Sequence, residues 1–446
     1  MLGIGLYAAM VAGSALFHFY LWVRLVRDTT RPGGTGRRWG TVAIVISAAV
    51  APATRILMPY LGPENGRWLA WPGYILIGVI LYLLTGLALA EIPRALAVRR
   101  IRAAERAAQG AVNAMVPVDT MVPAGTGGAV PAGAGTDPLD DTSGTPDGTE
   151  STRRVRITRG RPTIRPVATM DRRLFLGRTV GAAVGTAALA TTGYGMSSAL
   201  GDPVIKRVPV RLPRLDPRVT GLRIATISDL HLGPILGRSH TERVVRLINR
   251  LEPDLVAIVG DLADGTSAQL GHAITPFRSL ESRHGTFFAT GNHEYFYDDV
   301  QGWVEELRDL GVRPLLNERV EIHHNGGLLD LAGVEDVTGE EHDRGPDFTR
   351  ALAGRDADRA VVLLAHQPVL AEQASDHGVD LQLSGHTHGG QMFPLNAIAA
   401  LSNPVLSGLG RVGDTQLYVT KGVGTFGPPL RVGAAPDISV IELHGT

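Results

Sequence analysis

The chain has 446 residues, with 43 basic and 43 acidic side chains, 44% hydrophobic residues and no cysteine. This balance of charge argues against nucleic-acid binding, which calls for a basic surface. The absence of cysteine excludes disulfides and thiolate metal ligands. The two halves differ in character: long apolar segments dominate the first, whereas short apolar runs followed by polar motifs dominate the second.

Three long, predominantly apolar segments lie near the N-terminus: Leu2–Val26, Val42–Pro59 and Trp68–Ala90. A helix rises about 1.5 Å per residue, so each segment can cross, or nearly cross, a hydrocarbon layer about 30 Å thick. Pro52 and Arg55 interrupt the second segment, where a buried helix of a soluble domain is the alternative. We predict a membrane region over residues 1–94 with about three transmembrane helices.

Arginines follow the first and third segments and are scarce between the second and third. The first is followed by Arg27, Arg31, Arg37 and Arg38 and the third by Arg94, Arg99, Arg100, Arg102 and Arg106, whereas only Arg67 separates the second from the third. Because positively charged loops remain cytoplasmic, we expect the N-terminus outside and the stretch after Ala90 in the cytoplasm.

Residues 95–170 are predicted to form a disordered, partly basic linker. From Ala107 to Thr152 the sequence is rich in Gly, Ala, Pro, Thr and Asp and contains no aromatic residue. Such a composition cannot bury enough apolar surface to fold. The basic run from Arg153 to Arg165 either binds anionic lipid headgroups or is a soluble spacer.

A basic motif and a weakly apolar stretch follow the linker. Residues 171–176, Asp-Arg-Arg-Leu-Phe-Leu, resemble a twin-arginine export signal, and the Ala-, Gly- and Thr-rich stretch Thr179–Leu200 comes next. We expect residues 171–201 to form this signal or anchor. A fourth membrane helix is one alternative, and a cytoplasmic helix packed on the next domain is another. The first two readings place the remaining chain outside the cytoplasm.

Residues 202–446 have the pattern of one α/β domain. Apolar residues from Val244 to Leu251 recur at helical spacing, and this helix ends at Pro253. About 220 residues are enough for one substantial core. Strand patterns occur at Leu222–Ile227, Leu255–Val259, Thr286–Ala289, Leu328–Val334, Ala360–Leu364, Val379–Leu383, Gln416–Val419 and Ile438–Leu443.

Five polar motifs occur along this domain. They are Asp229-Leu230-His231, Gly260-Asp261, Gly291-Asn292-His293-Glu294, His366 and Gly385-His386-Thr387-His388. The first three directly follow a predicted strand, and the carboxyl ends of parallel strands open onto one crevice. In an extended backbone, residues two apart point to the same side, so Asp229 with His231 and His386 with His388 can face this crevice.

The residue types predict a site for two divalent metal ions. A carboxylate can touch both ions of such a pair, and Asp261 is placed to do so. Imidazole together with carboxylate and amide oxygens favours Mn, Fe or Zn. Any one histidine taken alone is more often a structural residue, and Gly-Asp and Asn-His pairs are common in turns.

The order of the motifs resembles the calcineurin-like metallophosphoesterase family, whose pattern is D-x-H, GD, GNH with an acid, H and GHxH. The resemblance extends from Leu222 to the C-terminus. Its bacterial membrane-associated or exported branch is suggested by residues 228–233, by the run SGHTHGGQ at 384–391 and by the Gly-rich segment Lys421–Arg431. The resemblance implies a four-layer α-β-β-α sandwich of two mixed sheets, preceded here by the transmembrane helical region.

The resemblance also implies a role for each motif residue. One metal would be held by Asp229, His231, Asp261 and His388, and the other by Asp261, Asn292, His366 and His386. His293 would be the general acid or a transition-state stabiliser. Asp264 matches the position that orients this histidine, with a helix N-cap or turn acid as the alternative.

We therefore expect a membrane-anchored, multi-pass phosphoesterase with an extracytoplasmic catalytic domain over residues 202–446. Water activated by two metal ions would hydrolyse a phosphate ester, with a phosphodiester favoured and a lipid-linked or cell-envelope substrate. The alternatives are a phosphomonoesterase, a lipid pyrophosphate hydrolase and a non-catalytic metal-binding membrane receptor. The expected partners are the phosphate-ester substrate and membrane lipids, without nucleic acid.

Overall fold

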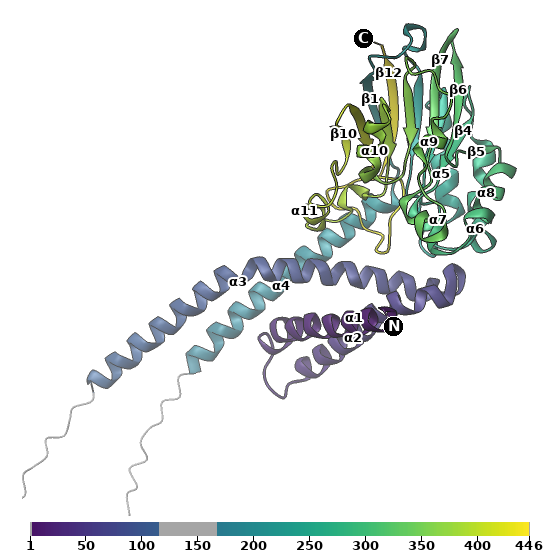
Figure 1. The fold of residues 1–446 in the computed structure, drawn as a ribbon. Helices are drawn as coiled ribbons and strands as arrows, with labels where there is room; N and C mark the ends of the chain where they lie inside the picture. Colours follow the sequence, from purple (N-terminus) through teal and green to yellow (C-terminus); the bar gives the residue numbers. More distant parts are fainter. Residues whose placement is uncertain (1, 116–166, 446) are drawn as a thin grey trace, which may run out of the picture. The chain divides into compact units, whose positions relative to one another are not determined.

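The computed structural model describes residues 2–115 and 167–445 (Figure 1). They form two compact units, one of Met1–Glu91 with Gly177–Thr446 and the other of Ile92–Leu176. Most of the predicted linker, with its basic run Arg153–Arg165, lies outside the described residues.

Long helices make up the N-terminal part of the chain. They are α1 (Leu2–Leu21), continued by the π-helical η1 (Trp22–Arg27), then α2 (Thr35–Asn65), α3 (Arg67–Met115) and α4 (Val167–Leu200). Among the described residues, four helical segments are long and apolar enough to cross a membrane: Tyr7–Arg27, Thr35–Asn65, Arg67–Ala111 and Arg172–Leu200. Pro52 does not end α2, whose helical geometry breaks only at Gly62.

Helix α3 extends further than the sequence led us to expect. It continues to Met115, past residue 95, where we placed the start of the linker. Residues 94–115 are rich in Ala and Arg and contain no proline, so they favour a helix. Near its end Glu105 accepts a 2.8 Å hydrogen bond from Arg173 of α4.

Twelve strands form two mixed six-stranded sheets. The first has the order β1-β12-β2-β3-β4-β5 and contains β1 (Val204–Arg211), β12 (Asp437–His444), β2 (Arg223–Ile227), β3 (Leu255–Val259), β4 (Thr286–Ala289) and β5 (Val312–Pro314). The second has the order β10-β11-β9-β8-β7-β6 and contains β10 (Gly408–Val412), β11 (Thr415–Val419), β9 (Leu381–Ser384), β8 (Val361–Leu364), β7 (Gly327–Gly333) and β6 (Glu318–His324). Only the pairs β12/β2, β10/β11 and β6/β7 are antiparallel.

The two sheets pack face to face, with helices on their outer sides (Figure 1). Strand β3 illustrates the pattern, because Leu255, Ala257 and Val259 enter the core between the sheets whereas Val256 and Ile258 pack against the outer helices. The first sheet is covered by α5 (Arg238–Asn249), α6 (Ser267–Ile274) and α8 (Val300–Asp309), and the second by α9 (Phe348–Ala351) and α10 (Ala371–Asp376). The predicted four-layer sandwich is confirmed.

Short helices complete the domain. They are α7 (Asn292–Phe296), α11 (Leu395–Ala399) and the 3-10 turns η2 (Pro217–Val219), η3 (Thr275–Ser279), η4 (Val337–His342), η5 (Pro368–Leu370) and η6 (His388–Gly390). The chain breaks between α7 and α8, where Asp298 takes a left-handed conformation with φ of 51°.

Candidate metal centre

The five motifs meet at the carboxyl ends of strands from both sheets. The loops after β2, β3 and β4 carry the first three motifs, and those after β8 and β9 carry the last two. Asp229, His231 and His388 bring one side-chain nitrogen or oxygen each within 4.8 Å of the others, and so do Asp261, His366 and His386. A third group of this kind consists of His231, Asp261 and His293.

The backbone at these residues is strained. Positive φ angles between 44° and 69° occur at Asp229, His231, Asp261, His386 and His388. The prediction of an extended backbone at the two spaced pairs is therefore wrong, although their side chains do converge. A left-handed conformation costs a non-glycine residue about 1–3 kcal/mol and is retained mainly where function fixes the geometry.

Glycines allow the loops to approach closely. A Cβ atom on Gly260, whose φ is 75°, would lie 2.6 Å from the Cα atom of Gly291 and 2.7 Å from Nδ1 of His366. The Gly-Asp and Gly-Asn-His motifs thus need their glycines because the two loops touch there.

Asp261 lies between the two main groups of side chains. Its Oδ2 is 3.6 Å from Nε2 of His231 and 3.2 Å from Nε2 of His366. Its Oδ1 accepts a 2.9 Å hydrogen bond from the backbone N–H of His293. One carboxylate oxygen therefore faces a histidine of each group, as a bridging ligand would.

The tautomers of His366 and His231 fit metal ions at this place. Nδ1 of His366 donates to the carbonyl oxygen of Val259 at 2.8 Å, so in the neutral ring Nε2 carries the lone pair. That Nε2 is buried and has no hydrogen-bond partner among the described residues. In His231, Nδ1 faces Oδ1 of Asp264 at 2.8 Å, which directs the lone pair of Nε2 towards Nε2 of His388, 3.0 Å away. A divalent cation would satisfy Nε2 of His366 and Nε2 of His231, whereas Nδ1 of His388 accepts from Arg431 at 2.9 Å.

Asp264 contacts two histidines rather than one. Its Oδ1 lies 2.9 Å from Nδ1 of His293 as well as 2.8 Å from Nδ1 of His231. Burial would raise the pKa of Asp264, but His231 and His293 hold it below its usual range. The N-cap of α6 is Thr266, so the alternative role of Asp264 as that cap is wrong.

His293 lies in a strongly negative environment. Burial lowers its pKa, but the charge of Asp261 and the adjacent Asp264 outweigh this effect and raise the pKa to about 9. Asn292, the residue before it, has its Oδ1 2.9 Å from Nδ1 of His386. All nine predicted site residues therefore lie in one cluster.

Glu294 fixes the loops that carry the centre. Its buried carboxylate accepts backbone N–H groups of Asp261 at 3.0 Å, Leu262 at 2.7 Å and Gly291 at 2.6 Å. Burial and the charge of Asp261 raise the pKa of Glu294 to about 7, although the N–H groups of Leu262 and Gly291 oppose this. Glu294 thus caps α7 and also ties this helix to the Gly-Asp loop.

Arg431 is a site residue that the motifs did not reveal. It is completely buried, and its guanidinium donates to the carbonyl oxygens of His388 at 2.9 Å and Gly424 at 3.0 Å. Burial lowers its pKa to about 10. Its position at the end of the Gly-rich segment from Lys421 was the only signal in the sequence. Arg431 holds that segment against the last histidine motif.

Comparison with known proteins identifies the family. Residues 222–390 match the family model for calcineurin-like phosphoesterase. A metallophosphoesterase from Helicobacter pylori strain J99 is 38% identical over 261 residues, a match that covers 57% of this chain and 68% of that protein. The chain belongs to the calcineurin-like phosphoesterase family.

Two other relatives show how far the likeness extends. A metallophosphoesterase from Aquifex aeolicus is 35% identical over 233 residues, or 51% of this chain and 87% of that protein. A transmembrane protein with metallophosphoesterase domain from Bos taurus is 41% identical over 262 residues, or 56% of this chain. The match spans 59% of the bovine protein.

Proposed function

We propose that the chain is a membrane-anchored phosphoesterase with a dinuclear metal centre, and that phosphodiesters are its substrates. The observation that carries this proposal is the Asp261 carboxylate, which faces His231 and His366 at 3.6 and 3.2 Å. One ion would be held by Asp229, His231, Asp261 and His388, and the other by Asp261, Asn292, His366 and His386. Their nitrogen and oxygen donors suit Mn, Fe or Zn.

When bound, two such cations supply Lewis acidity at the phosphoryl oxygens and lower the pKa of water towards neutrality. His293 would transfer a proton to the leaving oxygen as its bond to phosphorus breaks, giving an alcohol and a phosphate monoester. Because Nδ1 of His293 faces Asp264, Nε2 is the atom available for this transfer. Asp264 would hold the ring in place and stabilise its protonated form.

The preference for a diester rests on the resemblance to the exported branch of the family. It can be measured with the metal-loaded full chain on bis(4-nitrophenyl) phosphate and 4-nitrophenyl phosphate. We expect a higher kcat/KM for the diester. A higher kcat/KM for the monoester would make the protein a phosphomonoesterase, and a metal-loaded chain inactive on both would favour the binding role.

We also propose that three helices of residues 1–94 and the helix of residues 171–201 cross the membrane and that residues 202–446 are extracytoplasmic. Two contacts at opposite ends of α2 support this orientation. Near Asn65, the turn into α3 lies against the catalytic domain. Near Thr35, the arginine-rich loop lies against α4, where Arg178 donates to the carbonyl oxygen of Thr29 at 3.0 Å. Positively charged ends remain cytoplasmic, so the domain would face the other side.

A reporter enzyme that is active only outside the cytoplasm tests this topology. Fused after Leu200 it should be active, and fused after Gly34, in the arginine-rich loop, it should be inactive. Activity in the reverse pattern would contradict the orientation. The double change Arg172→Lys and Arg173→Lys removes the arginine pair but keeps its charge. It should abolish export from a twin-arginine signal, which needs the arginines, and leave an ordinary membrane helix unaffected, because the charge is the same.

A further inference from the structure

The membrane helices reach the candidate metal centre. The guanidinium of Arg55, on α2, lies 5.2 Å from the ring centre of Phe426. A Cβ atom on the neighbouring Gly427 would lie 3.8 Å from Nη1 of Arg55 and 3.9 Å from Cε1 of Tyr74, on α3. Two helices predicted to be membrane-spanning therefore contribute side chains to the Gly-rich segment of the catalytic domain.

Phe426 connects this contact to two histidines of the candidate metal centre. Its ring centre lies 5.4 Å from that of His231 and 5.1 Å from that of His293. Tyr297 lies in the same neighbourhood. Burial and the charge of Asp264 raise the pKa of its hydroxyl, and Arg55 acts in the opposite direction. The guanidinium of Arg55 and the rings of His231 and His293 thus contact the same phenyl ring.

An arginine in this position is costly. Arg55 interrupts an otherwise apolar segment, and charged residues in such segments are rare and mostly functional. Among the residues that the structure describes, Arg55 forms no ion pair with a carboxylate. Residue Arg55 is exposed, and its guanidinium contacts the Phe426 ring and the Tyr74 hydroxyl, so its remaining N–H groups would be the ones to meet an anion.

We propose that Arg55 is a substrate-binding residue, and that it binds the phosphate of an amphiphilic phosphodiester whose hydrocarbon chain stays among the membrane helices. This inference rests on the proposed function and adds the substrate class: a phospholipid-like ester taken from the surrounding membrane. Arginine binds phosphate through two parallel, charge-assisted hydrogen bonds. Metal ions and a single histidine do not supply such a pair of hydrogen bonds.

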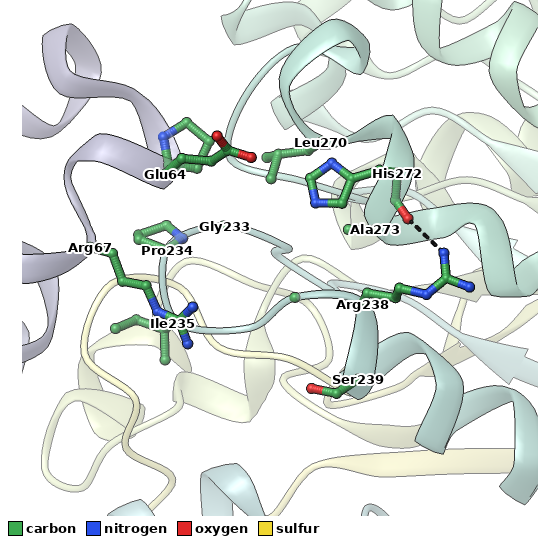
Figure 2. A pocket seen from close by; sticks show the side chains of 12 residues that line it. Glu64, Arg67, Gly233, Pro234, Ile235, Arg238, Ser239, Leu270, His272 and Ala273 are labelled. Atoms are coloured by element: carbon green, nitrogen blue, oxygen red, sulfur yellow. Dashed lines mark hydrogen bonds between the residues drawn. The ribbon is translucent and has the colours of Figure 1, made fainter.

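A cavity of about 340 Å³ suits the polar end of such a molecule. Glu64 and Arg67, at the turn between α2 and α3, face the loop of Gly233, Pro234 and Ile235 across it (Figure 2). A Cβ atom on Gly233 would lie 3.6 Å from Cβ of Asp264, so this wall adjoins the metal centre. Glu64 and Arg67 on one side of the cavity and Arg238 on another would solvate a polar headgroup.

An apolar surface lies beside α3 and α4. Met392 packs with Tyr82 of α3 and Ala188 of α4. The segment that follows it exposes Phe393 by 53%, Ile398 by 65% and Leu401 by 88%. Large apolar side chains exposed next to membrane helices fit the headgroup region of a bilayer. This surface would hold the candidate metal centre close to the lipid.

The test uses the metal-loaded full chain in mixed micelles and two diesters that differ only in one alkyl group, dodecyl 4-nitrophenyl phosphate and methyl 4-nitrophenyl phosphate. The wild type should have at least a tenfold higher kcat/KM for the dodecyl ester than for the methyl ester. Burial of a few methylene groups of the dodecyl chain is enough for a difference of roughly this size. Arg55→Gln should raise KM for both esters about 10- to 100-fold, with Arg55→Lys in between. The control Arg38→Gln, about 25 Å away along α2, should leave KM unchanged.

Binding of inorganic phosphate, measured by calorimetry on the same proteins, provides a readout that does not depend on turnover. Arg55→Gln should weaken it by a similar factor while the bound metal stays constant. Unchanged KM and phosphate affinity in Arg55→Gln would overturn the assignment of Arg55, and equal wild-type kcat/KM for the two esters would overturn the substrate class. Hydrolysis of neither ester by the wild type would instead refute the proposed function, and phosphate binding would still test Arg55.

Discussion

Asp261→Asn should lower both the bound metal and the turnover of the full chain, each by at least about 100-fold, since even residues behind the ligands change metal affinity by 10–100-fold. The carboxylate oxygen that faces His231 and His366 becomes part of a neutral amide, which cannot bridge two cations with the same charge. Metal content after dialysis and the rate on bis(4-nitrophenyl) phosphate measure the two effects.

This substitution should preserve the fold. Asparagine has nearly the same shape as aspartate and tolerates the left-handed conformation found at Asp261, where φ is 56°. Asp254 offers a matched control, because it is a buried aspartate just before the same strand, β3, and its carboxylate accepts the backbone N–H of Arg223. Asp254→Asn should retain its metal. If the metal content and the hydrolysis rate of Asp261→Asn equal those of the wild type, Asp261 is not a metal ligand.

His293→Ala should slow turnover by roughly 10²–10⁴-fold, the usual contribution of an acid–base residue, and leave the metal bound. His293 is held by Asp264 at 2.9 Å but also lies near His231 and Asp261 in one of the three potential metal groups. Loss of metal in His293→Ala would therefore make it a ligand instead. His323→Ala, at an exposed position on β6, is the control and should match the wild type.

The choice of leaving group separates the two roles proposed for His293. A diester that releases 4-nitrophenolate needs little protonation of its leaving oxygen, whereas one that releases an alkoxide depends on it. A general acid predicts a larger defect with the alkyl leaving group. An equal defect with both would indicate stabilisation of the transition state without proton transfer.

Local sequence was enough to predict the motif positions and much of the sheet. The runs before Asp229, Asp261 and Asn292 are apolar and short, and in an α/β fold the residues that follow such strands gather at one edge. The strands that we did not predict do not have such a purely apolar run. β1, for example, has charged Lys206 and Arg207 among its apolar residues because it lies at the edge of its sheet.

Features that depend on distant parts of the chain could not be predicted from local spacing. Glu294 clamps the Gly-Asp loop 33 residues before it, and Arg431 reaches the backbone of His388, 43 residues away. The left-handed backbone at the candidate ligands is likewise imposed by loop packing. Arg55 could be recognised in the sequence only as an interruption of an apolar segment, since its neighbour Phe426 lies in the other half of the chain.

Titration of Mn²⁺ into the metal-free full chain, with bound metal and the rate of diester hydrolysis followed in the same samples, tests the proposed metal-dependent activity most directly. We expect no hydrolysis without metal and a rate that saturates when two ions per chain are bound. A chelator-treated chain that hydrolyses the diester as fast as the loaded one would contradict metal-dependent catalysis at this centre.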